Sequence, residues 1–220
     1  CSMRLGTAGD DGAGIRLGKA AGGRADHLER CCAWRFINPP TAWTHGILVG
    51  PDGARICNEE LYGSTIGEHL AERFAGRGVL VIDHDAMELS RQQLRGETMG
   101  GFQLVFGFAN DYLNHEKAPT IGALAERCGI APMELAATVA AYNANVARGN
   151  DPMGKSAKAL HPIRTPPFYG INCDLDTIKF PTPSITLGGL AVDGLSGRVV
   201  RADGGDPIEG LYAAGRNAVG

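Results

Sequence analysis

The chain has 220 residues, with 21 Lys and Arg against 24 Asp and Glu, which gives a formal net charge of −3. Its 44% hydrophobic and 20% charged residues exclude a disordered chain, and the lack of a basic block argues against a nucleic-acid-binding protein. No apolar run reaches the ~18 residues that span a membrane, and the first residues lack the signal-peptide pattern, so we expect a soluble, cytoplasmic protein.

Glycine and acidic residues precede the first predicted helix. Asp10 and Asp11, followed by Gly12-Ala13-Gly14, lead into residues 15–21, a short amphipathic run that ends at Gly22. Gly12, Gly14 and Gly18 are not spaced as G-x-G-x-x-G, and no hydrophobic strand precedes them, which excludes a Rossmann fingerprint. The helix start could still offer amides of Gly12 and Gly14 to a phosphate or ribityl chain, and a plain helix start is an equal alternative.

The next elements predict a sheet covered by helices. Residues 46–49 and 54–57 flank a Gly-Pro-Asp-Gly turn, the pattern of a hairpin. Thr65 and Glu68 read as a capping box for a helix, and residues 79–83 as a buried strand. The apolar face of that helix would contain Ile66, Leu70 and Phe74.

After a less regular stretch, two helices are predicted, one from Thr120 to Gly129 and one that starts at Pro132. The residues expected to point inward are Leu124, Cys128, Leu135, Val139 and Tyr142. Residues 149–167 lack periodicity and indicate a domain boundary. Residues 184–192 and 198–201 predict a β-ribbon, and residues 211–215 a buried strand that ends in glycine.

Cysteines, histidines and acidic pairs do not form a recognisable centre. The six cysteines, at positions 1, 31, 32, 57, 128 and 173, lack zinc spacing and are interpreted as reduced thiols. The histidines have no metal-like spacing, and adjacent carboxylates on one element point apart. We therefore expect no metal, and the motifs of serine hydrolases, zincins and P-loop proteins are absent from the sequence.

The last third of the chain is the most informative. It contains Thr186-Leu187-Gly188-Gly189 and, later, Gly210-Leu211-Tyr212-Ala213-Ala214-Gly215-Arg216. This pair resembles the closing motif of the FAD domain in fumarate reductase/succinate dehydrogenase-type flavoproteins. In that family the first element passes beside the isoalloxazine and the second reaches the flavin from below, where glycine lets a planar ring approach the backbone.

The resemblance implies FAD as the cofactor. The residues that it places at the cofactor are Gly188, Gly189, Ala214, Gly215 and Arg216, and the helix start described above adds Gly12 and Gly14 to the predicted cofactor site. Residues 46–59 are similar to the family's "G-hydrophobic-V…G-x-R-F-x-N-E" hairpin, and residues 118–143 are similar to its "A-x-T…T-V-x-x-Y-N" helix pair. The similarity therefore covers nearly all of the chain.

Two parts of the family pattern are missing from this sequence: the initial strand with G-x-G-x-x-G, and the glycine-rich turn and helix after "GLYAAG". We therefore expect a fragment with an α+β fold, namely a cap domain plus part of an α/β FAD-binding domain. The expected bounds are 1–26 and 161–220 for the segments of the FAD-binding domain and 27–160 for the cap domain.

The residues after Asn58-Glu59 distinguish branches of the family. Fumarate and succinate enzymes have an Arg four residues after that Glu and a His before "T-x-GG"; here Gly63 and Ile185 stand at these positions. A dicarboxylate needs cationic partners, so that substrate class is disfavoured. Tyr62, three residues after Glu59, resembles the catalytic Tyr of the 3-ketosteroid Δ4-(5α)-dehydrogenase branch, whereas spacing alone favours a packing role.

The resemblance predicts an FAD-dependent oxidoreductase that dehydrogenates or reduces a C–C bond next to a ketone, with Tyr62 as catalytic residue. The substrate would be a small, steroid-like ketone, and an external acceptor would take the electrons. One alternative is a fumarate-reductase-like enoate or dicarboxylate reductase. Another is an isolated domain that binds no flavin and catalyses nothing.

Overall fold

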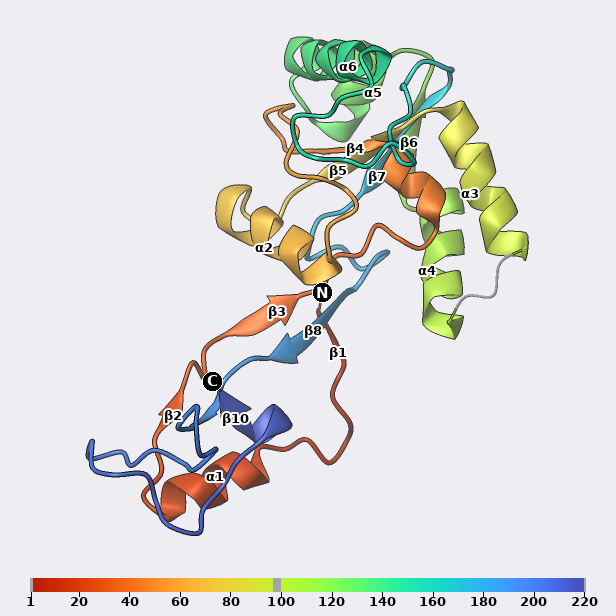
Figure 1. Ribbon diagram of the computed structural model, residues 1–220. Helices are drawn as coiled ribbons and strands as arrows, with labels where there is room; N and C mark the ends of the chain where they lie inside the picture. The colour runs from red at the N-terminus through yellow and green to blue at the C-terminus, as the bar shows by residue number, and fades with distance from the viewer. Residues whose placement is uncertain (1, 97–99, 220) are drawn as a thin grey trace. The chain divides into compact units, whose positions relative to one another are not determined.

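The computed structural model describes residues 2–96 and 100–219, and the chain divides into two compact units. Unit 1 comprises Ala33–Thr182 together with Ser2, and unit 2 comprises Met3–Cys32 and residues 183–219. Each unit contains both helices and strands (Figure 1), so the predicted mixed class of fold is confirmed.

A four-stranded antiparallel sheet forms the centre of unit 1. Its order is β4 (Ile47–Val49), β5 (Val79–Ile82), β7 (Phe168–Asn172) and β6 (His115–Ala118). Ile47 pairs with Val81 and Leu48 with Leu80, so successive residues face opposite sides of the sheet. The predicted strand at 79–83 is confirmed. The predicted hairpin forms only in part: β4 has one bridge, from Val49 to Arg55, to the segment after its turn.

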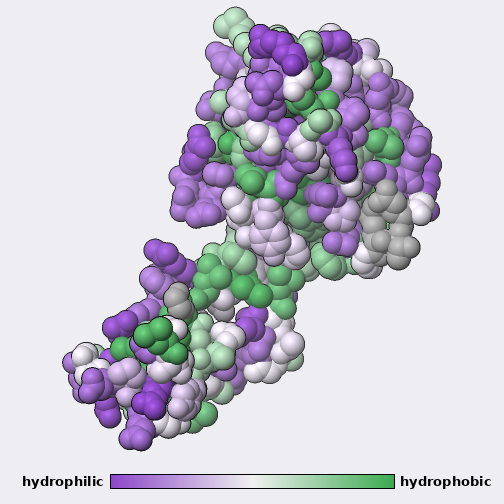
Figure 2. All heavy atoms as spheres, viewed as in Figure 1, coloured by the Kyte–Doolittle hydropathy of each residue, from purple (hydrophilic) through white to green (hydrophobic). Residues whose placement is uncertain are grey.

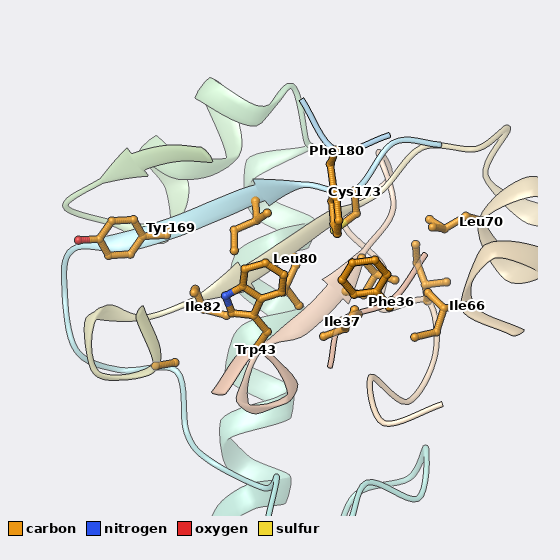
Figure 3. Close-up of a cluster of buried hydrophobic side chains, with 14 of the residues drawn as sticks. Phe36, Ile37, Trp43, Ile66, Leu70, Leu80, Ile82, Tyr169, Cys173 and Phe180 are labelled. Carbon is orange, nitrogen blue, oxygen red and sulfur yellow. The ribbon is translucent and has the colours of Figure 1, made fainter. Parts of the chain in front are cut away.

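Helices cover both faces of this sheet, which explains why its strands are apolar throughout. On one face, α5 (Ile121–Cys128) and α6 (Pro132–Ala147) pack on Ile47, Val49 and Val81. On the other face, α2 (Gly63–Arg73) and α3 (His84–Gly96) pack on Leu80 and Ile82 together with Trp43 (Figure 3). The helix α4 (Gly101–Tyr112) and a short 3-10 turn, Thr41–His45, complete that layer.

The predicted ends of the α5–α6 pair are confirmed by their caps. Thr120 Oγ1 accepts a hydrogen bond from Ala123 N at 3.2 Å, and Gly129 ends α5 with a φ of 66°. Pro132 opens α6 in its first turn, where its missing N–H costs nothing. Leu124, Leu135, Val139 and Tyr142 are buried and Cys128 is partly buried, as their spacing predicted.

Two predictions for the middle of unit 1 are wrong. The helix α2 starts at Gly63, with Tyr62 as its N-cap, so Thr65 lies inside the helix and cannot form a capping box. The stretch interpreted as irregular contains α3 and α4. Their contact buries Ser90, whose hydroxyl donates to an oxygen of Asp111.

Unit 2 is built on close approach between one helix and one strand. The predicted first helix is confirmed as α1 (Ala13–Ala20), and β9 (Gly189–Ala191) lies between β10 (Ala218–Val219) and β2 (Ala25–Asp26). A Cβ at Gly18 would overlap the side chain of Leu190, and a Cβ at Gly14 would overlap that of Asn217. Because residues four apart share one helix face, these glycines let α1 approach the sheet.

The strands after residue 182 differ from the prediction. The expected strand at 184–192 is interrupted after β8 (Thr182–Thr186), which lies between β1 (Ser2–Arg4) and β3 (Cys31–Ala33). The expected buried strand at 211–215 is wrong: its only described ladder contact is a bridge from Tyr212 to Arg198, and Tyr212 is 59% exposed. The last residue of this segment, Gly215, begins a 3-10 turn that extends to Asn217.

The surface of the chain is polar over most of its visible face (Figure 2). Within residues 2–96 and 100–219, no helix combines the length and the apolar character needed to cross a bilayer. The cysteines at 31, 32, 57, 128 and 173 are all free thiols, while Cys1 lies outside the described residues.

A buried cluster of four charged side chains ties the segment before Tyr62 to the rest of unit 1. Arg55 binds Glu59 at 2.7 Å and Asp151 at 2.5 Å, and Lys155 Nζ lies 2.8 Å from Glu59 Oε2. Glu59 Oε1 also accepts the amide of Leu48 in β4 at 2.8 Å. Burial opposes the charge of Arg55, but the two carboxylates raise its pKa overall, so the guanidinium stays charged.

This cluster makes a prediction for stability. Replacing Arg55→Met leaves Glu59 and Asp151 with one cation between them, which should lower the free energy of unfolding by about 3–5 kcal/mol. The control variant Arg148→Met replaces an exposed arginine near the end of α6. It should change the free energy of unfolding by less than ~0.5 kcal/mol. Urea denaturation followed by circular dichroism measures both, and equal stability of the two variants would contradict the role of the cluster.

Candidate functional site

The predicted site residues are divided between the two units. Tyr62 belongs to unit 1, and the seven residues predicted at the cofactor all belong to unit 2. Each group is therefore described within its own unit.

Tyr62 stands on the surface of unit 1, among aromatic side chains. It is 66% exposed, and its ring centroid lies 5.7 Å from that of Trp34. The centroid of Phe36 lies 6.0 Å from that of Trp34 and 6.2 Å from that of Phe102, which is 42% exposed. We call Trp34, Tyr62 and Phe102, which lie around the buried Phe36, the Tyr62 surface. Among the residues that the structure describes, none hydrogen-bonds to the Tyr62 hydroxyl, so this hydroxyl is free to contact a ligand.

Trp34 explains the glycine that follows Tyr62. A Cβ at position 63 would overlap the indole Cδ1 and Nε1 atoms of Trp34, and it would lie 3.2 Å from the Cα of Phe36. The indole Nε1 is buried there without a hydrogen-bond partner in the described chain. No side chain fits at position 63 while Trp34 keeps this place. The indole of Trp34 therefore fills the space into which a longer side chain at position 63 would project.

Two of the predicted cofactor residues of unit 2 line one pocket. Gly14 of α1 and Ala214 line a pocket of about 240 Å³, together with Leu190, Tyr212 and Asn217. Nearby, Gly12 and Gly215 have positive φ angles of 79° and 57°, which favour glycine. Arg216 lies 3.5 Å from Asp10, which precedes α1. The structure thus brings together residues 12–14 and 214–216, which are about 200 positions apart in the sequence.

Gly188 and Gly189 have a different environment. A Cβ at Gly188 would overlap the carbonyl oxygen of His27, and a Cβ at Gly189 would lie 2.7 Å from the carbonyl carbon of Ala218. Both glycines are buried. Contacts within unit 2 therefore suffice to require glycine at these positions, and their contact with flavin stays a prediction.

The Glu of the Asn58-Glu59 motif is not available as a catalytic group. Its Oε1 accepts from Leu48 N and Arg55 Nε, and its Oε2 accepts from Arg55 Nη2 at 2.7 Å and contacts Lys155 Nζ. Sequence reasoning missed Asp151 and Lys155, because they lie in the stretch interpreted as a domain boundary. It also missed Trp34, for which the only signal was the unusual Gly63.

The environment of Gly189 makes a second prediction. Gly189→Ala would press a methyl group against the backbone of β10, so unit 2 should lose about 1–3 kcal/mol of stability. Gly194→Ala is the matched control, because nothing lies within 4 Å of the added Cβ and its φ is not positive. Limited proteolysis of the apo chain should cleave residues 183–219 faster only in the first variant. Equal cleavage of both variants would contradict the assigned packing.

Known proteins match nearly the whole of this chain. The family described as "FAD binding domain" matches residues 5–220. The 3-oxo-5-alpha-steroid 4-dehydrogenase of Comamonas testosteroni is 35% identical over 212 residues, which are 96% of this chain and 40% of that protein. The NADH:acrylate oxidoreductase of Vibrio harveyi is 42% identical over 100 residues, 45% of this chain and 9% of that protein.

Among solved structures, the 3-ketosteroid-delta4-(5alpha)-dehydrogenase of Rhodococcus jostii RHA1 matches with a TM-score of 0.73 and 28% identity. The match covers 96% of this chain and 40% of that one. The chain thus spans about two fifths of the length of the steroid dehydrogenases that it matches. It belongs to the FAD binding domain family of fumarate reductase-type flavoproteins, and the proteins that it matches over nearly its whole length include 3-ketosteroid dehydrogenases.

Proposed function

We propose that this chain is part of an FAD-dependent oxidoreductase that acts on the C–C bond next to a ketone in a small, flat, apolar molecule such as a 3-ketosteroid. In this proposal unit 1 is the cap domain, expected at residues 27–160, and unit 2 contributes to the FAD-binding domain. Residues 161–182, which were expected in the FAD-binding domain, lie in unit 1, where β7 belongs to the central sheet. The observation that carries the proposal is the placement of Trp34 against Gly63, beside Tyr62.

Trp34 and Gly63 favour an apolar substrate over a dicarboxylate. The resemblance implies an Arg at the position of Gly63 in fumarate and succinate enzymes, and the indole of Trp34 leaves no room for it. An anionic substrate would lose its hydration here without a cation in return, which is costly. A ring system can instead bury its faces against Trp34 and Phe102, with a gain of roughly 25 cal/mol per Å² of apolar surface.

Tyr62 has the chemistry that a ketone requires. Its phenol can donate a hydrogen bond to the carbonyl oxygen, which makes the adjacent C–H more acidic, or exchange a proton at the neighbouring carbon. Its hydroxyl has no other partner in the described residues, and the N-cap position at the start of α2 fixes its backbone.

The residues of unit 2 fit contact with part of FAD. Ala214, Gly215 and Arg216 are exposed, and nothing lies within 4 Å of a Cβ built on Gly215, so a flat ring could approach this backbone. The adjoining pocket, at about 240 Å³, is smaller than the ~300–1,000 Å³ typical of drug-sized ligands, and so it suits only a part of a dinucleotide. When bound, FAD supplies the isoalloxazine that takes up or returns a hydride.

Binding of a ketosteroid to the Tyr62 surface can be measured in this chain. Addition of 4-androstene-3,17-dione, the ligand of the Rhodococcus structure, should quench or shift the fluorescence of the partly exposed Trp34. In a Trp34→Phe variant the remaining Trp43 is 1% exposed, so its emission should not respond. Fumarate should leave both proteins unchanged. No response to the steroid, or an equal response to fumarate, would contradict the proposed substrate class.

The role of Tyr62 can be tested in the longer protein that contains this segment. Tyr62→Phe removes one oxygen and no apolar contact, so flavin content and folding should be unchanged. General acid–base groups contribute ~10²–10⁴-fold, so kcat with a ketosteroid should fall by at least about 100-fold. Tyr112→Phe, in another exposed tyrosine of unit 1, serves as the control. A rate near that of the wild type would return Tyr62 to a packing role.

A further inference from the structure

A polar pocket in unit 1 is not explained by the proposed function. It lies at the sheet between Val79 of β5 and Gly170 of β7, has a volume of about 240 Å³ and is lined mainly by charged and amide side chains. This volume is below the ~300–1,000 Å³ of sites for drug-sized molecules. The pocket is therefore too small and too polar for a steroid or a whole FAD, and it suits a small ion or the charged end of a larger ligand.

Three cationic side chains reach this pocket from separate parts of the chain. Arg77 precedes β5, Arg127 is in the last turn of α5, and Lys179 follows β7. In the ranges 2–96 and 100–219, none of the three has a carboxylate within the 4.0 Å of an ion pair. Such a concentration of positive charge stands out in a chain whose net charge is −3. Cations held this near each other repel, and an anion bound between them would relieve the repulsion.

The stems of two of these side chains are fixed, and their remaining donors are free. Lys179 Nζ donates to the carbonyl oxygen of Leu113 at 3.1 Å, and one nitrogen of Arg127 donates to that of Lys117. Since a guanidinium has five N–H donors and an ammonium three, most of them remain for a ligand. The amide of Asn172 also lines the pocket.

The carboxylates of the pocket do not cancel this charge. Asp174 Oδ1 accepts a hydrogen bond from Gly78 N at 2.9 Å, so this carboxylate is engaged with the backbone. Glu116 is exposed at the edge strand β6. Two carboxylates against three permanent cations leave a net charge of +1 around the pocket.

We propose that this pocket binds a phosphate group, either as the free ion or as the end of a small phosphate ester. Guanidinium forks match the geometry of phosphate oxygens, and charge-assisted hydrogen bonds are about twice as strong as neutral ones. The proposal does not depend on the oxidoreductase function, because its residues are separate from the Tyr62 surface and from unit 2.

The test uses the 220-residue chain and inorganic phosphate. Isothermal titration calorimetry, supported by ³¹P line broadening, should show saturable binding that weakens with added NaCl. The double variant Arg77→Gln/Lys179→Gln should bind phosphate about tenfold more weakly or worse, because it removes two charge-assisted contacts. The matched control Arg148→Gln/Lys158→Gln removes the same charges from exposed positions outside the pocket and should bind like the wild type.

A second arm distinguishes the free ion from an ester. Adenosine monophosphate that binds more tightly than inorganic phosphate, with adenosine not binding, identifies a phosphate ester, whereas inorganic phosphate as the tighter ligand identifies the free ion. Absence of phosphate binding, equal weakening in the control variant, or adenosine binding as well as its phosphate would each overturn the proposal. If the double variant does not fold, Arg77→Gln alone decides, since the Arg77 side chain has no polar contact within the described chain.

Discussion

The buried charges of Arg55, Glu59, Asp151 and Lys155 are the constraint on which unit 1 depends. A buried charge is tolerated only when it is paired and hydrogen-bonded, and each of these four meets that condition through a partner in another segment. The cluster joins the edge strand β4, the segment before α2, and the loop after α6. The backbone that leads to Tyr62 therefore has one position relative to the sheet, although Tyr62 itself is on the surface.

In this arrangement two motif residues that are three positions apart, Glu59 and Tyr62, have different roles. Glu59 is structural, because all its hydrogen-bonding capacity is used inside the core. Three residues later, Tyr62 starts α2 and leaves its hydroxyl open. A rigid internal anchor next to an exposed functional group is a common way to orient a side chain without burying it. Trp34 adds the second support, since its ring lies against both Tyr62 and Gly63.

Glycine serves several purposes in this chain, and residue type alone does not separate them. Gly14 and Gly18 bring a helix close to a strand, Gly63 makes room for an indole, and Gly129 ends a helix with a positive φ. Gly215 stands in open space, so only its backbone conformation requires glycine. The glycines predicted at the cofactor are therefore glycines for different physical reasons. Gly188 and Gly189 are packed against their own chain, whereas Gly215 is exposed and needs only its backbone conformation.

The sequence by itself determined the elements whose signals are local. The caps of α5 and α6, the apolar run of β5 and the helix α1 depend on neighbouring residues, and all were predicted correctly. The family and its cofactor also followed from the sequence, through short motifs such as Thr186-Leu187-Gly188-Gly189. Such motifs keep their residue types because a backbone must pass close to another group.

Only the tertiary structure decided which distant residues meet. The stretch with Asp151 and Lys155 was interpreted as a domain boundary, because nothing local shows that their charges pair with Arg55 and Glu59 about 100 positions earlier. The helices α3 and α4 were missed, and the hydrogen bond between Ser90 and Asp111 that joins them cannot be seen in either sequence segment alone. The place of Trp34 over Gly63 was hidden for the same reason: contacts between distant segments form in three dimensions, whereas sequence patterns report only the nearest turns.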